Sequence, residues 1–254
     1  HRVDRRQRQM CIRDSNSTGV QRDRPLTNEQ YEVSVLSVCI DFKSPYAFVA
    51  HELIWQLEVR SGFLVNWLPL TLNIGSFLGR AEKRDDGQVV DSNRTPKQWS
   101  VVKAAYREAR CYAENQGRML RGPLKIWDSS KAGIALIWAQ NHADTRAQLK
   151  DFMTDVFDRF WQRDCDIEDL DILNAALLNA GIQSAGFIDY AQGAGRASHD
   201  LLQDQLLTQG VFGVPSFIVD DEIFFGREHL DTVLWRLNGS QGPMPFVRYP
   251  WQAL

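Results

Sequence analysis

The chain has 254 residues, of which 44% are hydrophobic and 24% charged, and this composition is typical of a globular enzyme with one large domain or two small ones. The net charge of −3 argues against a general nucleic-acid partner, and no apolar run approaches the roughly 20 residues of a membrane helix, so no membrane partner is expected. Its four cysteines form no close pair, which excludes a disulfide framework or a metal site and favours a reducing cytoplasm: Cys11, Cys39, Cys111 and Cys165.

The first thirty residues differ in composition from the rest of the chain. They hold seven arginines and four acidic residues and little that can be buried. No apolar segment follows the arginines, so a secretory signal is not expected. Either residues 1–30 are a basic arm for nucleic acid or they are a disordered or non-native tail, and we favour the tail because unanchored termini are rarely ordered.

A βαβ unit is predicted for the next part of the chain, residues 31–95. The run 33–40 is rich in β-branched residues and predicts a buried strand. Ser44-Pro45 opens a helix, and 63–70 predicts a second strand parallel to the first. The helix has one apolar face: Phe48, Leu53, Ile54 and Leu57. A long polar connection is expected over 79–93, with a turn at Asp85-Asp86-Gly87.

The middle of the chain, residues 96–209, is predicted to be a helical insertion domain. Apolar residues recur at helical spacing in five segments, and glycines follow two of these segments as stop signals. The predicted helices are 96–115, 128–138, 149–160, 172–180 and 201–209.

Strand signals return in residues 210–240. Segment 216–219 predicts a strand, Asp220-Asp221 a turn, and 222–225 a second strand of a hairpin, followed by a helix over 228–237. Residues 241–254 are expected to form an extended tail, because they contain several prolines. The order of these elements predicts an α/β protein, a thioredoxin fold interrupted by a large α-helical insertion.

Two segments suggest a family. Asp41-Phe42-Lys43-Ser44-Pro45-Tyr46-Ala47 follows the first strand, where a thioredoxin fold usually has Cys-x-x-Cys, and Gly210-Val211-Phe212-Gly213-Val214-Pro215 precedes the last hairpin. With these segments, residues 33–237 resemble the kappa-class glutathione transferases and the 2-hydroxychromene-2-carboxylate isomerases, which are members of the DsbA-like thioredoxin superfamily. The resemblance implies a DsbA/kappa-like fold and glutathione as the cofactor.

Ser44 is the candidate catalytic side chain. Serine before proline is a common helix N-cap, and that structural role is one interpretation. The resemblance implies a second role, in which the Ser44 hydroxyl donates a hydrogen bond to the sulfur of bound glutathione. The positive potential of a helix N-terminus favours a thiolate there.

Val214 and Pro215 are candidates for holding glutathione. Proline is tolerated at a strand start with a trans bond, but the resemblance implies a cis Val214–Pro215 bond facing the Ser44 turn. The Val214 backbone would then pair with glutathione as it would with an extended peptide strand.

Three further positions relate to the glutathione site through the resemblance. Asn93 matches an asparagine that contacts glutathione, although Asn before a helix is also an ordinary cap. Arg227 and Glu228 stand where relatives place a small polar residue and an aspartate that grip the γ-glutamyl end. Glu228 can still accept from an ammonium, whereas Arg227 either binds a carboxylate or is solvated.

Lys43 and Tyr46 are candidate substrate contacts. Lys43 precedes Ser44 and is either solvated or positioned to attract a carboxylate. Tyr46 is either a core residue or a substrate contact in the first helical turn. Trp127, Asp128 and Lys131 are weaker candidates for lining a cleft, and Cys39 is expected to be a buried, inert thiol.

The resemblance implies a glutathione-dependent isomerase or transferase that acts on an aromatic-derived unsaturated keto acid, without a metal. Kappa-class relatives are dimers, so a homodimer is an expectation. Two alternatives stay open: a DsbA-like oxidoreductase without the Cys-x-x-Cys pair, and a non-catalytic module that binds a thiol or peptide. The physiological substrate cannot be chosen from the sequence.

Overall fold

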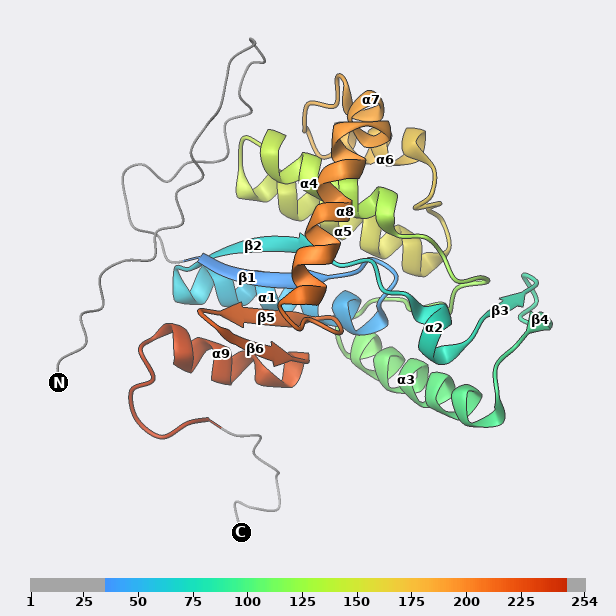
Figure 1. Ribbon diagram of the computed structural model, residues 1–254, viewed down its shortest axis with the longest axis horizontal. Coiled ribbons are helices and arrows are strands. Elements are labelled where there is room, and N and C mark those ends of the chain that lie inside the picture. The colour runs from blue at the N-terminus through green and yellow to red at the C-terminus, as the bar shows by residue number, and fades with distance from the viewer. Residues whose placement is uncertain (1–34, 246–254) are drawn as a thin grey trace.

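The computed structural model describes residues 35–245 and opens with the predicted βαβ unit (Figure 1). Strand β1 (Val35–Ile40) leads into helix α1 (Pro45–Ser61), and β2 (Leu64–Pro69) returns parallel to β1. Helix α1 ends at Gly62, whose φ of 75° lies in the left-handed region that glycine adopts without strain. Positions 1–34 and 246–254, which include the predicted N-terminal tail and most of the C-terminal one, lie outside the described residues.

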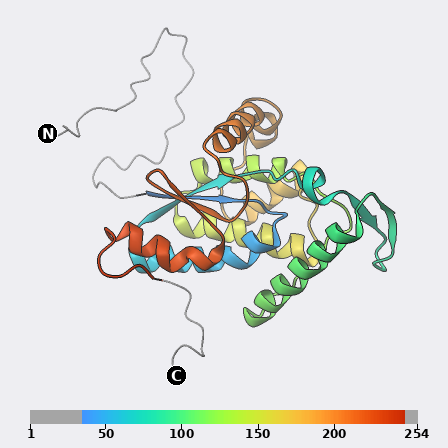
Figure 2. The ribbon, with the colours of Figure 1, turned by 60° about the horizontal axis from the view of Figure 1, so that its bottom comes forward.

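The predicted hairpin near the other end of the chain completes the sheet. Strands β5 (Ser216–Val219) and β6 (Glu222–Phe225) are antiparallel, and β5 pairs antiparallel with β1, giving the strand order β2-β1-β5-β6. A 3-10 turn, η1 (Arg227–His229), then leads into helix α9 (Leu230–Leu237). Helices α9 and α1 lie together on one face of the sheet, and α8 lies on the other face (Figure 2).

The helices between β4 and β5 form the predicted insertion. In Figure 1, α4, α5, α6 and α7 gather above the sheet and α8 runs down in front of it, whereas α3 packs against α1. Four of the five sequence-based helices extend beyond their predicted bounds, α3 has the bounds that were predicted, and α7 was not predicted. The helices are α3 (Pro96–Asn115), α4 (Ser130–His142), α5 (Arg146–Gln162), α6 (Leu170–Asn179), α7 (Phe187–Gln192) and α8 (Ala194–Thr208). The protein therefore has an α/β thioredoxin-like fold with a helical insertion.

The predicted polar connection over 79–93 has its turn where it was expected, but it also contains two strands that were not predicted. After a short helix, α2 (Ile74–Leu78), strands β3 (Ala81–Lys83) and β4 (Val89–Ser92) form an antiparallel hairpin around the predicted turn. The two strands are too short and too exposed to show a period-2 apolar pattern. The hairpin is fixed by a tertiary contact instead, because the Lys83 backbone N–H donates to the Leu124 carbonyl at 2.7 Å.

Aromatic side chains fasten α1 to α5. Phe42 and Phe48 are buried, and their ring centroids lie 4.6 and 6.0 Å from that of Phe157 on α5. Such ring pairs are stabilising beyond their buried area. The packing fixes the position of the turn between β1 and α1, which includes Ser44. No helix in residues 35–245 is long and apolar enough to cross a membrane.

Candidate functional site

The turn that begins α1 places Ser44 at the helix N-cap. The Ser44 hydroxyl accepts from the Ala47 backbone N–H at 3.3 Å, and the Ser44 N–H donates to the Asp41 carbonyl at 2.9 Å. The Ser44 hydroxyl hydrogen donates to none of the described residues. A donor in that position, combined with the positive end of the helix dipole, suits an anionic ligand atom.

Asp41 and Lys43 form a buried ion pair beside Ser44. The Lys43 Nζ lies 3.7 Å from an Asp41 carboxylate oxygen, and the two side chains are 7% and 0% exposed. Asp41 also accepts from the backbone N–H groups of Lys43 at 3.0 Å and Leu72 at 2.8 Å. The expectation that Lys43 is solvated is therefore wrong, because Asp41 holds it inside the protein.

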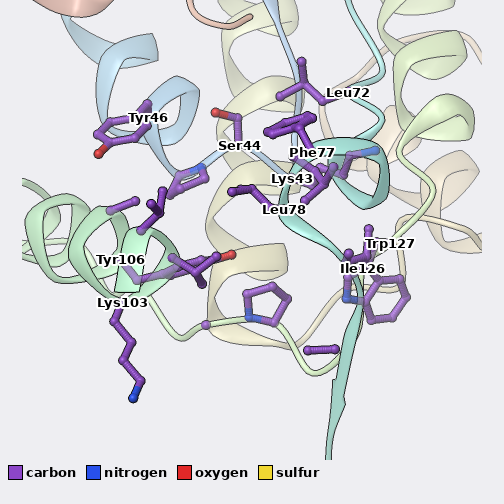
Figure 3. A pocket seen from close by; sticks show the side chains of 18 of the residues that line it. Lys43, Ser44, Tyr46, Leu72, Phe77, Leu78, Lys103, Tyr106, Ile126 and Trp127 are labelled. Carbon is purple, nitrogen blue, oxygen red and sulfur yellow. The ribbon is translucent and has the colours of Figure 1, made fainter. Parts of the chain in front are cut away.

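A cavity of about 800 Å³ opens in front of the turn (Figure 3). Its volume is within the usual range for small-molecule sites. Ser44, Lys43, Tyr46 and Val214 all line it. The walls are aromatic and cationic, and no described acidic residue lines them: Tyr46, Phe77, Trp99, Tyr106, Trp127, Phe212 and Phe225, with Lys43, Lys83, Arg94, Lys103, Arg110 and Lys125.

The segment before β5 contributes Val214, but not Pro215, to the cavity lining. The Val214–Pro215 peptide bond is cis, as the resemblance predicted, and both residues are buried. The Pro215 carbonyl accepts from Gly226 N–H at 2.9 Å, whereas the backbone N–H and C=O of Val214 have no partner among the described residues. Those two groups are available to an extended peptide.

Tyr46 belongs to a polar cluster next to this wall. The Tyr46 hydroxyl donates to Glu108 on α3 at 2.8 Å, and the Tyr112 hydroxyl donates to the other Glu108 oxygen at 2.9 Å. The Arg227 guanidinium stacks on the Tyr112 ring, 3.3 Å from its centroid. Burial raises the pKa of Tyr46, and Glu108 and Glu228 raise it further. Tyr46 is half-buried and is not a core residue.

The remaining sequence candidates lie outside the cavity lining. Arg227 contacts Tyr112 and Glu228 acts on Tyr46 through its charge, and Asn93 is exposed at the end of the β3–β4 hairpin. The Asn93 side-chain oxygen accepts from the Arg80 N–H at 2.6 Å. Asn93 is not the helix cap either, because Thr95 caps α3 in a capping box with Gln98. Of the weaker candidates, Trp127 lines the cavity and Asp128 and Lys131 do not.

Buried Cys39 supplies no reactive thiol. It lies within β1, and burial raises the pKa of its thiol to about 12. A thiol with such a pKa is not a nucleophile at neutral pH. No described cysteine lines the cavity, which agrees with the expected inert Cys39.

Sequence analysis missed the α3 and hairpin side chains that form the outer wall. Trp99, Lys103, Tyr106 and Arg110 recur every three to four residues and share one face of α3. That alternation of aromatic and cationic residues is visible in the sequence. Lys83 and Arg94 join them only through the hairpin, which the sequence did not predict.

The sheet order, the helical insertion and the cavity at the start of α1 define a thioredoxin-like protein of the DsbA type. The chain belongs to the family of the DsbA-like thioredoxin domain, whose model matches residues 35–238.

Known proteins support this assignment. The chain is 24% identical over 195 residues to 2-hydroxychromene-2-carboxylate isomerase from Sphingobium xenophagum, covering 75% of this chain and 91% of the relative. A solved 2-hydroxychromene-2-carboxylate isomerase superposes with a TM-score of 0.60 at 21% identity, covering 82% of this chain and all of that one. The cytosolic disulfide reductase DsbM from Pseudomonas aeruginosa, solved with glutathione, gives 0.52 at 12% identity, over 81% and 98% of the two chains.

Proposed function

We propose that this protein is a glutathione-dependent isomerase or transferase of the 2-hydroxychromene-2-carboxylate isomerase type, acting on an aromatic-derived unsaturated keto acid. The observation that supports it most is the Ser44 hydroxyl at the N-terminus of α1, open to an aromatic and cationic cavity. The distant homologue is named for the same reaction.

The residues around Ser44 fit a thiol cofactor. The hydroxyl hydrogen of Ser44 is free among the described residues, and α1 adds the positive potential of its N-terminus. Together they stabilise a sulfur anion and lower the pKa of a thiol placed there. When bound, glutathione supplies the thiolate that adds reversibly to the substrate double bond, so that the bond can rotate.

The neighbouring backbone fits the peptide part of glutathione. The Val214 N–H and C=O have no partner among the described residues and offer one donor and one acceptor to an extended chain. The carboxylates of Glu108 and Glu228 act on Tyr46 and raise the pKa of its hydroxyl. We expect the γ-glutamyl ammonium on that side.

The rest of the cavity fits an aromatic acid. Its aromatic walls exclude water and orient a flat ring, and its cations favour an anion. Small-molecule sites of this kind are mostly apolar with a few placed polar groups. The homodimer remains an expectation from the family resemblance, because the structure contains a single chain.

The test is an absorbance assay of 2-hydroxychromene-2-carboxylate isomerisation with and without glutathione. We expect turnover that needs glutathione and saturates with it. Turnover that is equal without the thiol would contradict the proposal. Reduction of an insulin disulfide with no isomerisation would instead support the oxidoreductase alternative.

A second candidate function is a module that binds a thiol peptide without catalysis. The stacking of Arg227 on Tyr112 favours it, since this cation occupies the side where an ammonium should bind. Calorimetry separates the two: micromolar glutathione binding with no turnover on any aromatic keto acid supports the module.

A further inference from the structure

Four cations of the cavity have no acidic partner among the described residues: Lys83, Arg94, Lys103 and Arg110. Among them, Arg94 donates weakly to the Gly79 carbonyl at 3.4 Å, and Arg110 donates to the Leu120 carbonyl at 3.4 Å. The two other cations that line the cavity are paired, Lys43 with Asp41 and Lys125 with Glu168. Free positive charge is therefore confined to one part of the wall.

Within that part, three of the four cations contact aromatic rings, and together with those rings they form what we call the hairpin end: Lys83 on β3 and Arg94 after β4, with Trp99, Tyr106 and Arg110 on α3. The Lys83 Nζ lies 5.7 Å and the Arg94 Cζ 5.1 Å from the centroid of the same Trp99 ring. The Arg110 Cζ lies 6.0 Å from the Tyr106 centroid. Trp99 thus contacts Lys83 and Arg94, and Tyr106 contacts Arg110, and neither ring neutralises the charge of its cations.

The Tyr106 side chain adds a hydrogen-bond donor at the hairpin end. Figure 3 shows it reaching from α3 into the cavity. Its hydroxyl makes no hydrogen bond to a described residue. Burial raises the pKa of Tyr106 to about 12, although Arg94 and Arg110 oppose this, so the phenol keeps its proton at neutral pH.

The cations at this end also repel one another. Burial lowers the pKa of Lys83, and the charges of Arg94, Arg163, Arg110 and Lys103 lower it further. Burial likewise lowers the pKa of Arg94. An anion placed among these groups would relieve the repulsion, because opposite charges within about 4–6 Å favour the charged forms.

Lys43 offers less to an anion, although it lies beside Ser44. Its ammonium already faces the Asp41 carboxylate. It also interacts with Asp128: burial raises the pKa of that carboxyl, but hydrogen bonds from Ser130 and the charges of Lys43 and Arg196 lower it below its ordinary value. An anion at Lys43 would have to approach two carboxylates.

We propose that the hairpin end is the carboxylate-binding site of the cavity, formed by Lys83, Arg94 and Arg110 with the Tyr106 hydroxyl. This deepens the proposed function and rests on it only for the identity of the substrate. An aromatic acid binds with its carboxylate toward the β3–β4 hairpin and its far side toward Ser44. The hairpin thereby selects aromatic carboxylates over neutral aromatics.

The experiment measures binding without any thiol, so that it is independent of turnover. Calorimetry compares 2-naphthoate with its neutral amide, 2-naphthamide, on the full chain and on Lys83→Met and Arg94→Gln. We expect the wild type to bind the carboxylate at least about ten-fold more tightly, and each variant to reduce that ratio about five-fold or more. Lys97→Met is the matched control, since Lys97 is exposed in the first turn of α3 and lies outside the cavity lining.

Three results would overturn the inference. They are a wild type without carboxylate preference, a preference unchanged in both Lys83→Met and Arg94→Gln, and a preference lost in Lys43→Met but kept in Lys83→Met. A thermal melt of each variant shows that it is folded before its ratio is used. If the preference behaves as expected but isomerisation needs no glutathione, the proposed function fails while the carboxylate site stands.

Discussion

The two ends of the cavity satisfy their charges in different ways. At the end near Ser44, Lys43 forms an ion pair with Asp41, and the Asp41 carboxylate also accepts hydrogen bonds from two backbone N–H groups. At the hairpin end, Lys83, Arg94 and Arg110 line the same cavity without an acidic partner among the described residues. The first arrangement fixes the geometry of a turn, whereas the second leaves charge available to a ligand. Mutations of the Asp41–Lys43 pair should therefore change stability, and mutations of the cations at the hairpin end should change binding.

The largest effect should follow Asp41→Ala. The change leaves the buried Lys43 ammonium without its carboxylate partner and removes the acceptor of two backbone N–H groups. We therefore expect the free energy of unfolding to fall by about 3–5 kcal/mol. Chemical denaturation measures it. Lys83→Met at the hairpin end is the matched control and should stay within about 0.5 kcal/mol of the wild type. Equal losses in the two variants would remove the distinction between the ends.

His51 on α1 should make the stability of the protein sensitive to acid. Burial lowers the pKa of His51 to about 3, and the charge of Arg118 lowers it further. The unfolded chain takes up this proton near the ordinary pKa of about 6.5, so stability is full above pH 6.5 and is lost as the pH falls toward 3. Between pH 6.5 and 5 the loss due to His51 should be about 2 kcal/mol.

Denaturation of wild type and His51→Phe at several pH values checks this. The variant keeps a ring against Phe157, which lies 4.8 Å from the His51 ring, but has no proton to take up. Its stability should fall less than that of the wild type over the same pH range. Parallel pH curves for the two proteins would show that His51 does not titrate in this way.

The Ser44→Ala variant tests whether the Ser44 hydroxyl has a catalytic role. We expect glutathione-dependent turnover to fall about ten-fold or more, which corresponds to about 1.4 kcal/mol in the barrier, with a loss of about 1 kcal/mol of stability from the missing cap. Thr145→Ala removes a comparable cap from α5, away from the cavity, and should lower stability alone. If turnover is unchanged in Ser44→Ala, the side chain is a helix cap and has no chemical role.

The smallest effect concerns the polar cluster behind Tyr46. In the double variant Arg227→Ser with Glu228→Asp, glutathione should bind a few-fold more tightly. The variant loses a cation beside the expected ammonium and shortens a carboxylate that costs rotamer entropy to order. Calorimetry on the double variant and on Arg227→Ser alone separates the two contributions. Equal or weaker binding would show that the Arg227–Tyr112 stack belongs to a working site.

Local sequence predicted the Ser44 end well. Ser44-Pro45 after a β-branched run forms the expected cap, and the Val214–Pro215 bond is cis, as the resemblance to the family implied. These features depend on neighbouring residues in the chain or on a short motif, so they can be found without a structure. The same analysis left Lys43 either solvated or positioned in the site, because nothing in the sequence spacing shows that Asp41 pairs with Lys43 and accepts a hydrogen bond from Leu72.

The sequence by itself determined the βαβ unit, the helical insertion and the terminal hairpin, because apolar periodicity and turn residues act over short distances. Tertiary structure alone decided that the β3–β4 hairpin forms and carries Lys83 to the cavity. Strands β3 and β4 have little apolar pattern, and their position depends on the Lys83–Leu124 backbone hydrogen bond between segments about forty residues apart. That contact fixes the strand that carries Lys83, which reaches Trp99 on α3, and long-range contacts of this kind leave no periodic signal in the sequence.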